Sequence, residues 1–340
     1  MSSTPARPIH RRPVGRLAAA LVALTLGLVG CGGDTRKDEP GPAPAPGAFP
    51  VTVDHKYGST EITRQPTRVV TLGLSDQDPV LALGTVPVGA VDWFLERPYG
   101  KWPWAQQLWG GTPPEIVGER DDYNLEKIAA LRPDLIIGLY SGMTEQQYQQ
   151  LSRIAPTVAQ PKGHADYAAP WQELTRQAGR ALGRADRAEQ LIADVDARFA
   201  RARQEHPELA GKTVAVVEPY EPGKYAVFAP SDPKVVFMTQ LGLTVPQTIV
   251  QAAGDEYAAE IGSERLDLVD VDRLFFLTSD ASAEPRVRAD RVYATLDVAK
   301  QNRAVFLPYE NPPLGAALSF STVLSVPYAL DQILPLLGTA

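Results

Sequence analysis

The sequence predicts an α/β protein of two lobes with mostly parallel sheets, joined by one long α-helix. Short apolar runs alternate with helical patterns through most of the chain. Residues 185–206 contain no Gly or Pro, and their apolar residues fall on one helical face. The segment 124–140, NLEKIAALRPDLIIGLY, returns in similar form at 263–279 as SERLDLVDVDRLFFLTS. We therefore expect two α/β lobes built alike, with the long helix between them.

The expected elements follow this rhythm. In the first half, strands are expected at 68–74, 87–93, 135–139 and 157–160, and helices at 75–84, 125–131, 145–154 and 171–183. In the second half, the strand and helix pattern resumes at 212–220, 233–242, 272–279 and 304–309 and ends in a helix at 325–337. The strands are nearly all apolar, which is typical of parallel sheets covered on both faces.

The N-terminal region indicates export. Four arginines precede an apolar stretch at 17–30, which has the length of a signal-peptide core and is too short to span a bilayer. Cys31, the only cysteine, closes the run LVGC, which resembles the lipobox of bacterial lipoproteins. That resemblance implies cleavage before Cys31 and a diacylglycerol anchor on it. The alternative is an incidental cysteine in an apolar segment.

Composition sets the domain boundaries and excludes some functions. Residues 1–30 are the expected signal peptide, and residues 31–50 are an anchored cysteine with a Pro- and Gly-rich tether. The N-terminal lobe is expected at 51–184, the connecting helix at 185–207 and the C-terminal lobe at 208–340. The formal net charge of −7 is spread along the chain, so nucleic-acid binding is not expected. One cysteine also excludes a disulfide within the chain.

The repeated segment places one glutamate in each lobe. Aligning Glu126 with Glu264 brings the two copies together without a gap, and each reads as a helix with a Glu in its first turn followed by a buried strand. Val271 stands where the first copy has Pro133, so the second copy departs from the first. The alternative is that any helix-to-strand unit has this pattern, because Glu is favourable near a helix N-terminus.

The first copy carries a family resemblance. NLEKIAALRPDLIIG is similar to the signature run of the iron-siderophore and cobalamin class (class III) of ABC-transporter substrate-binding proteins, and the likeness extends over nearly the whole mature chain. It implies a class III periplasmic binding protein fold, with ligand held in the cleft between the lobes. It also implies that Glu126 and Glu264 dock onto arginines of the two permease subunits.

Ligand-binding residues are expected at the carboxyl ends of the strands, where ligands bind in such folds. The candidates there are Trp93, Tyr140, Ser141, Tyr220, Tyr225 and Tyr309. Tyr and Trp combine a flat apolar face with one hydrogen-bond donor, which suits a bulky, partly polar chelate. The alternative for each aromatic residue is ordinary packing.

Arg120 lies in the loop before the signature helix. Hydroxamate-siderophore binders of this family resemble the chain in placing an Arg in that loop and a Tyr after the next strand, which correspond to Arg120 and Tyr140. A guanidinium stays charged and directs several donors at the oxygens of a chelate. The alternative is a surface Arg paired with Asp121 or Asp122, and these two acids also argue against a highly anionic catecholate.

The resemblance thus implies a monomeric binding protein, lipid-anchored on the extracytoplasmic face of the cell membrane. It captures a ferric siderophore and delivers it to an ABC permease dimer with its ATPase, and it needs no cofactor of its own. Haem or cobalamin is the alternative ligand.

Two other classes are not expected. A direct metal site is not expected, because only His55, His164 and His206 follow the signal segment. A lipid-anchored hydrolase is the remaining alternative: Ser75 or Ser141 could pair with His164, but the chain has no GxSxG motif. We therefore expect no enzyme activity.

Overall fold

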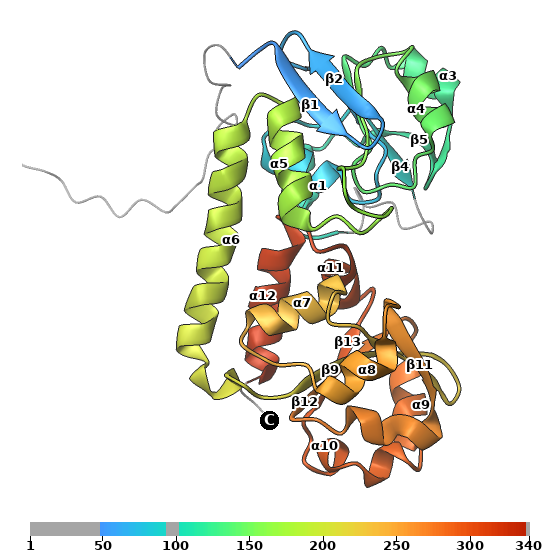
Figure 1. Ribbon diagram of the computed structural model, residues 1–340, viewed down its shortest axis with the longest axis vertical. Coiled ribbons are helices and arrows are strands. Elements are labelled where there is room, and N and C mark those ends of the chain that lie inside the picture. Colours follow the sequence, from blue (N-terminus) through green and yellow to red (C-terminus); the bar gives the residue numbers. More distant parts are fainter. Residues whose placement is uncertain (1–47, 93–101, 338–340) are drawn as a thin grey trace, which may run out of the picture. The chain divides into compact units, whose positions relative to one another are not determined.

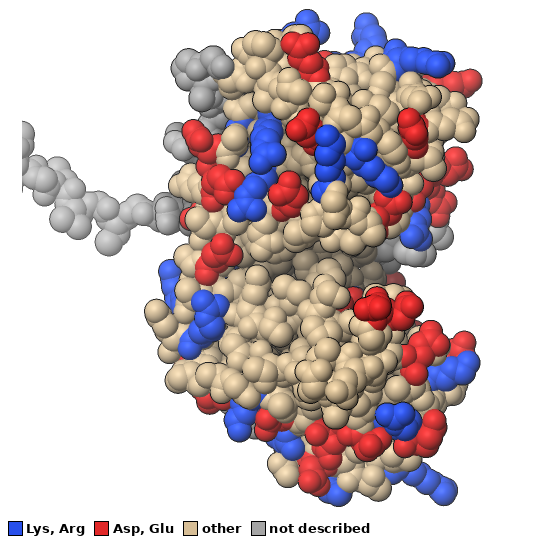
Figure 2. Space-filling view, viewed as in Figure 1, with Lys and Arg blue, Asp and Glu red and all other residues tan. Residues whose placement is uncertain are grey.

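The computed structural model describes residues 48–92 and 102–337 (Figure 1). The expectations for the signal segment, for Cys31 and for Trp93 lie outside these residues. Within them, none of the helices combines the length and apolar character that a membrane span requires. Lys and Arg side chains are interspersed with Asp and Glu over the face shown in Figure 2.

The N-terminal sheet has the strand order β6-β5-β4-β3-β7-β8. Its strands are β3 (Val69–Thr71), β4 (Gly89–Asp92), β5 (Glu115–Glu119), β6 (Asp122–Tyr123), β7 (Leu135–Ile137) and β8 (Thr157–Val158). All its pairings are parallel except that of β5 with β6. Its helices are α1 (Gln77–Ala82), η1 (Gln106–Trp109), α3 (Leu125–Ala130), α4 (Glu145–Leu151) and α5 (Trp171–Ala181).

A separate hairpin of β1 (Val51–His55) and β2 (Gly58–Ile62) precedes this sheet. It was not predicted from the sequence. Its buried residues alternate along both strands, and the amide of Gln177 on α5 donates to the Asp54 carbonyl at 2.9 Å. The hairpin therefore covers part of the N-terminal lobe as a half-buried antiparallel pair.

The C-terminal sheet has the order β11-β10-β9-β12-β13. Its strands are β9 (Val214–Glu221), β10 (Lys224–Phe228), β11 (Ala258–Gly262), β12 (Arg273–Thr278) and β13 (Ala304–Pro308). Pairings of β12 with β9 and β13 are parallel, whereas β10 pairs antiparallel with β9 and β11. The α/β class is confirmed, but the expectation of a mostly parallel sheet is wrong for this lobe. A turn of two residues, Pro222 and Gly223, separates β9 from β10 and allows only an antiparallel return.

Helices and short 3₁₀ turns complete the C-terminal lobe. They are α7 (Pro233–Gln240), α8 (Gln247–Ala253), η3 (Ser263–Val269), α9 (Ala283–Ala289), η4 (Tyr293–Thr295), α10 (Asp297–Lys300), α11 (Leu314–Phe320) and α12 (Ser325–Leu337). The second copy of the repeat thus begins with the 3₁₀ helix η3, whereas the first copy begins with the α-helix α3.

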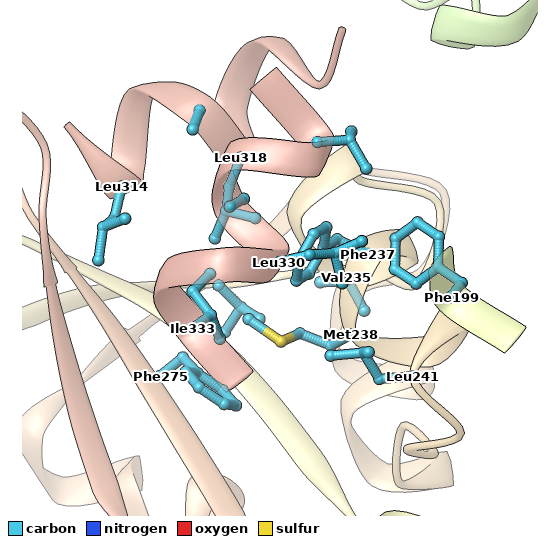
Figure 3. Close-up of a cluster of buried hydrophobic side chains, with 14 of the residues drawn as sticks. Phe199, Val235, Phe237, Met238, Leu241, Phe275, Leu314, Leu318, Leu330 and Ile333 are labelled. Carbon is cyan, nitrogen blue, oxygen red and sulfur yellow. The ribbon is translucent and has the colours of Figure 1, made fainter. Parts of the chain in front are cut away.

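The long helix α6 (Ala185–Glu205), followed by η2 (Pro207–Leu209), belongs to two hydrophobic cores. Ala188 lies in the core of the N-terminal lobe, and Phe199 lies in that of the C-terminal lobe. Figure 3 shows Phe199 beside α7, where its ring centroid is 5.3 Å from that of Phe237. Each end of α6 is therefore fixed to a different lobe by apolar packing.

One interaction is repeated in both lobes at the start of a central strand. The Asp134 carboxylate, just before β7, accepts the backbone N–H of Thr67 at 2.9 Å and its hydroxyl at 2.9 Å. The Asp272 carboxylate, just before β12, accepts the backbone N–H of Thr213 at 2.9 Å and its hydroxyl at 2.8 Å. Each Thr precedes the neighbouring parallel strand, so each Asp fixes the start of two strands. Desolvation alone would raise the pKa of both carboxyls. The hydrogen bonds from Arg68 and Thr67 at Asp134, and from Thr213 at Asp272, hold each pKa below its usual range.

Replacement of either carboxylate should destabilise the fold. In a soluble protein of residues 32–340, we expect Asp134→Ala and Asp272→Ala each to lower the free energy of unfolding by about 1–3 kcal/mol, because the Thr N–H and hydroxyl at each strand start lose a charged acceptor. Asp267→Ala, at an exposed position of η3, is the control and should change it by less than about 0.5 kcal/mol. Urea unfolding measures all three variants. Equal midpoints for the strand variants and the control would contradict this account.

Candidate functional site

Two loops meet at the carboxyl ends of β3 and β7. Asp76, fully buried in the loop after β3, accepts backbone N–H groups from Gly73 at 2.9 Å, Leu139 at 2.8 Å and Tyr140 at 3.0 Å. Burial raises the pKa of Asp76 to about 6, although these three donors oppose the shift. Its carboxylate therefore fixes the backbone of Tyr140 from the neighbouring loop.

Asp78, two residues later, connects elements of both lobes. Its Oδ2 atom accepts the indole N–H of Trp104 at 2.8 Å and the hydroxyl of Thr322 at 2.5 Å. The Thr322 hydroxyl in turn accepts the backbone N–H of Ser325, at the start of α12, at 2.9 Å. Burial raises the pKa of Asp78 to about 7, despite these two donors. A single carboxylate thus links α1 to the first turn of α12.

Arg120, Tyr167 and Tyr140 contact one another in a row, and the two tyrosine rings meet edge to face. The Arg120 guanidinium carbon lies 5.2 Å from the ring centroid of Tyr167, and that ring lies 5.6 Å from the ring of Tyr140. A hydrogen bond with Tyr167 raises the pKa of Arg120, so the guanidinium remains charged. The Arg120 backbone, at φ 51°, donates its N–H to the Asp92 carbonyl at the end of β4 at 2.7 Å.

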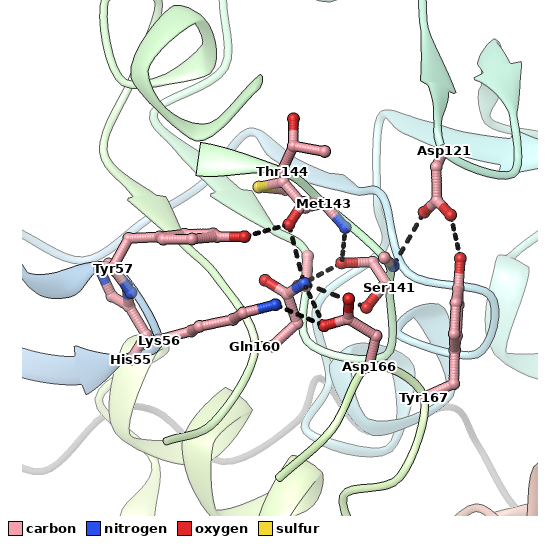
Figure 4. A network of polar contacts seen from close by, with 12 residues as sticks. His55, Lys56, Tyr57, Asp121, Ser141, Met143, Thr144, Gln160, Asp166 and Tyr167 are labelled. Atoms are coloured by element: carbon pink, nitrogen blue, oxygen red, sulfur yellow. Dashed lines mark hydrogen bonds and ion pairs between the residues drawn. The ribbon is translucent and has the colours of Figure 1, made fainter. Parts of the chain in front are cut away.

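The Asp121 carboxylate fixes Tyr167 of this row by a hydrogen bond. The carboxylate accepts the Tyr167 hydroxyl, as Figure 4 shows. It also accepts the Tyr123 hydroxyl at 3.2 Å and the backbone N–H of Gly142 at 3.0 Å. A Cβ at Gly142 would lie 2.8 Å from an Asp121 oxygen and 3.1 Å from the Tyr167 hydroxyl. Only glycine allows the close approach of these groups.

Aromatic side chains join the two lobes. The Trp102 ring stacks on Trp104 at 5.1 Å and on Phe320, from α11, at 5.2 Å, and Trp104 contacts Tyr328, from α12, at 5.3 Å. Tyr140, Tyr167 and Tyr309 pack against the same group, which we call the aromatic cluster; its members are Leu74, Trp102, Trp104, Tyr140, Tyr167, Tyr309, Ala316 and Phe320. Residues from distant parts of the sequence therefore form one apolar wall.

A cavity of about 110 Å³ opens beside Tyr140. It is lined by Tyr140, Ala168, Ala169, Pro170, Trp171, Gln172, Ser231, Pro233, Val236, Phe237, Gln240, Phe320, Ser321 and Val326. These residues come from both lobes. No aspartate, glutamate, lysine, arginine or histidine is among them.

The structure brings together only part of the predicted ligand set. Tyr140 and Tyr309 belong to the aromatic cluster, and Arg120 contacts the cluster through Tyr167. Tyr220, near the end of β9, is 37% exposed. These residues remain candidates, whereas Trp93 lies outside the described residues.

Two candidates have their hydroxyl groups occupied inside the fold. Ser141 is fully buried, and its hydroxyl donates to the Gly138 carbonyl at 2.9 Å. Tyr225 is 2% exposed, and its hydroxyl donates to the Asp290 carboxylate at 2.9 Å. Both residues stay sequence predictions, but neither is included in the proposed site because their hydroxyls are already bonded within the fold.

Both glutamates of the repeat lie on exposed helical turns. Glu126 is in the first turn of α3, which begins where the Asn124 side chain accepts the backbone N–H of Lys127 at 2.9 Å. Glu264 is exposed in the first turn of η3. The described residues therefore present one accessible carboxylate from each copy of the repeat.

Sequence reasoning missed several residues of this region. Trp171 begins α5 and Phe320 ends α11, and neither position carries a sequence signal of a shared cavity. Tyr167, before α5, likewise carries no signal that it joins the aromatic cluster. Asp76 and Asp78 lie at the start of the helix expected at 75–84, where Asp is common, yet the side chain of Asp76 makes no cap hydrogen bond. Two acids within an otherwise apolar stretch were the available signal. Over the described ranges, no group of three His, Cys, Asp or Glu residues is placed to hold a metal ion.

Comparison with known proteins gives consistent matches. The model of the family described as periplasmic binding protein matches residues 69–310. The probable siderophore-binding lipoprotein YfiY of Bacillus subtilis (strain 168) is 31% identical over 236 residues, which are 68% of this chain and 69% of the relative.

Solved structures match over most of the chain. A periplasmic solute binding protein from Mycobacterium smegmatis str. MC2 155 has a TM-score of 0.75 and 34% identity, and the match covers 85% of this chain and 97% of that one. Streptococcus pneumoniae TIGR4 PiaA in complex with ferrichrome has a TM-score of 0.68 and 27% identity, with coverage of 85% and 97%.

The buried carboxylate of Asp78 predicts a pH dependence. Its pKa is about 7 in the folded protein and near 3.9 in an unfolded chain, so the folded state binds the extra proton between these values. Protonation of Asp78 therefore stabilises the folded state. This stabilisation is complete below the unfolded pKa and is lost as the pH rises through about 7. We expect the free energy of unfolding of Asp78→Asn to fall less steeply between pH 5 and 8 than that of the wild type. Urea unfolding across this range measures both slopes, and parallel profiles would exclude the role of Asp78.

Proposed function

Because the chain belongs to the periplasmic binding protein family, we propose that it captures a ferric siderophore between its lobes and delivers it to an ABC importer. The likeness to YfiY, named for siderophore binding, and to PiaA, solved with ferrichrome, supports this ligand class. The observation that carries the proposal in this chain is the charged Arg120 beside the tyrosine row. Haem or cobalamin remains the second candidate ligand of the same fold.

Arg120 and Tyr140 have the chemistry that a ferric chelate requires. The exposed guanidinium of Arg120 can donate several hydrogen bonds to iron-bound oxygens, and it stays charged over the physiological pH range. Tyr167 and Tyr140 supply flat surfaces for the organic part of the ligand. The neighbouring Asp121 carboxylate lowers the local positive charge, which favours a weakly charged chelate such as a ferric hydroxamate over an anionic catecholate.

Other residues extend the proposed cleft. Tyr309 packs on the aromatic cluster, and Tyr220 is accessible near the end of β9. Because β9 and β13 both pair in parallel with β12, their carboxyl ends lie at one edge of the C-terminal sheet. We propose Tyr220 and Tyr309 as the contribution of the C-terminal lobe. Trp93 remains a proposed contact on sequence grounds.

Delivery would use the two exposed glutamates. Glu126 and Glu264 lie at equivalent positions of the repeated segment, each before a central parallel strand. Two matched carboxylates suit arginines on the two subunits of a permease, in charge-assisted pairs. We further propose a monomer tethered to the extracytoplasmic face of the membrane by lipid on Cys31. Members of the family and the matched relatives are binding proteins, and we propose no catalytic activity for this chain.

Ligand binding can be tested by quenching of tryptophan fluorescence in residues 32–340. The panel is a ferric tris-hydroxamate, a ferric tris-catecholate, ferric citrate, haem, cobalamin and free Fe³⁺. We expect saturable quenching by a ferric chelate, because Trp102 and Trp104 lie in the aromatic cluster. Arg120→Ala and Tyr140→Ala should each weaken the affinity at least about tenfold through loss of a charged or aromatic anchor.

Matched surface variants control this experiment. The variants Arg201→Ala and Tyr257→Ala should retain the wild-type affinity. Arg201 lies on the exposed face of α6, and Tyr257 is 67% exposed. If only haem or cobalamin gives saturable quenching, that compound and not a siderophore is the ligand. No binding by any member of the panel would contradict the proposed function.

Docking can be tested separately from capture. In cells that depend on this protein for uptake of radioactive ferric chelate, Glu126→Arg and Glu264→Arg should each reduce the uptake rate at least about tenfold, because each introduces repulsion at one permease subunit. The purified variants should bind the chelate normally. Glu205→Arg, at the exposed end of α6, is the control. Normal uptake by both docking variants would exclude these contacts.

A further inference from the structure

We propose that the cavity beside Tyr140 receives a short alkyl or acyl arm of the ferric siderophore. The substrate would then be a chelate with an apolar substituent, whose iron-binding part lies against Arg120 and Tyr167. This inference rests on the proposed function and adds the substrate class. It is carried by the chemistry, the size and the connections of the cavity.

The floor of the cavity is apolar and its polar residues lie at the rim. Trp171, Phe237, Phe320 and Val326 are at most 8% exposed and surround the inner part. The one buried hydroxyl, that of Ser321, donates to the Leu318 carbonyl at 2.7 Å and is satisfied within its own helix end. The remaining polar lining residues are partly or fully exposed: Tyr140, Gln172, Ser231 and Gln240. A floor that is apolar apart from the indole N–H of Trp171 therefore disfavours a charged group.

The size of the cavity decides which part of the ligand it can hold. Sites that enclose a whole drug-sized ligand have volumes of roughly 300–1,000 Å³. The cavity has about 110 Å³, too little for a ferric chelate. An engineered apolar cavity of about 150 Å³ in another protein stays dry and takes up benzene. A group of a few methylenes, or one small ring, matches this volume.

The cavity is continuous with the proposed chelate site. Tyr140 lines the cavity and also contacts Tyr167, whose other neighbour is Arg120. Phe320 lines the cavity from the C-terminal lobe and stacks on Trp102 in the aromatic cluster. A ligand with its chelating oxygens at Arg120 would therefore have the cavity within reach on the far side of Tyr140.

The mouth of the cavity allows a clean test. Val236, on α7, is a lining residue that is 36% exposed, so a larger side chain there can obstruct the opening without disturbing a core. Val86, 42% exposed and absent from the lining, is the matched control position. The variants are Val236→Trp and Val86→Trp.

The probes are the ferric complexes of desferrioxamine B and of its N-acetyl, N-butanoyl, N-hexanoyl and N-dodecanoyl amides, which share one hydroxamate core. For the wild type and Val86→Trp, we expect the affinity to rise about three- to fourfold per added methylene over the short chains and then to level off. In Val236→Trp the affinity should no longer rise with the length of the acyl chain, and the affinity for the shortest amide should equal that of the wild type. Equilibrium titration of the full mature chain gives these values.

The outcomes separate the inference from its premise. Equal affinities for all chain lengths in the wild type would overturn the inference and leave the proposed function standing. An undiminished chain-length dependence in Val236→Trp would also overturn it, because the arm would then lie elsewhere. No binding of any of these ferric hydroxamates would overturn the inference, and failure of the wider chelate panel as well would overturn the proposed function.

Discussion

Two buried carboxylates hold the candidate site together: Asp76, in the loop after β3, and Asp78, in the first turn of α1. Asp76 fixes the neighbouring loop that carries Tyr140, and Asp78 joins Trp104 to Thr322 of the other lobe. Both acids are removed from water, so their hydrogen-bond donors must come from the protein. Burial raises the pKa of both acids even though these donors oppose the shift. The desolvation of these two carboxylates is thus an unfavourable contribution located where the two lobes meet beside Tyr140.

The two lobes share a local construction and differ around it. In each lobe, an aspartate before a central strand accepts hydrogen bonds from a threonine before the neighbouring parallel strand: Asp134 from Thr67, and Asp272 from Thr213. The same register places the preceding helical turn, with its exposed glutamate, against the same side of each strand pair. Outside this unit the sheets diverge, because a tight hairpin turns β10 antiparallel in the C-terminal lobe. The sequence repeat therefore reflects the same hydrogen-bonded arrangement at the start of two strands in each lobe, and not a duplicated sheet.

Elements with a strong apolar period could be predicted from the sequence. The long helix was expected at 185–206 and is α6, Ala185–Glu205, because one continuous face of small and apolar residues packs on both cores. The β1–β2 hairpin was missed because its two-residue turn, Lys56 and Tyr57, lacks the Asn or Gly typical of such turns. The antiparallel return of β10 was missed because this strand is an almost continuous buried run, which does not reveal its direction. In the region of the site, Arg120 and Tyr140 were predicted from the resemblance to hydroxamate-siderophore binders, which place an Arg before the signature helix and a Tyr after the next strand. Trp171 and Phe320 could not, because only tertiary packing brings them to the cavity.

The same packing limits how far the lobes can move. Ala188 and Phe199 anchor the two ends of α6 in different cores, so a wide opening would expose apolar surface at one of them. The hydrogen bond from Thr322 to Asp78 and the stacking of Trp102 on Phe320 oppose the same motion. A ligand arm in the shared cavity would bury apolar surface from both lobes and thereby favour one lobe angle. In such a protein, loading would be signalled by a small adjustment of the two lobes and not by a large closure.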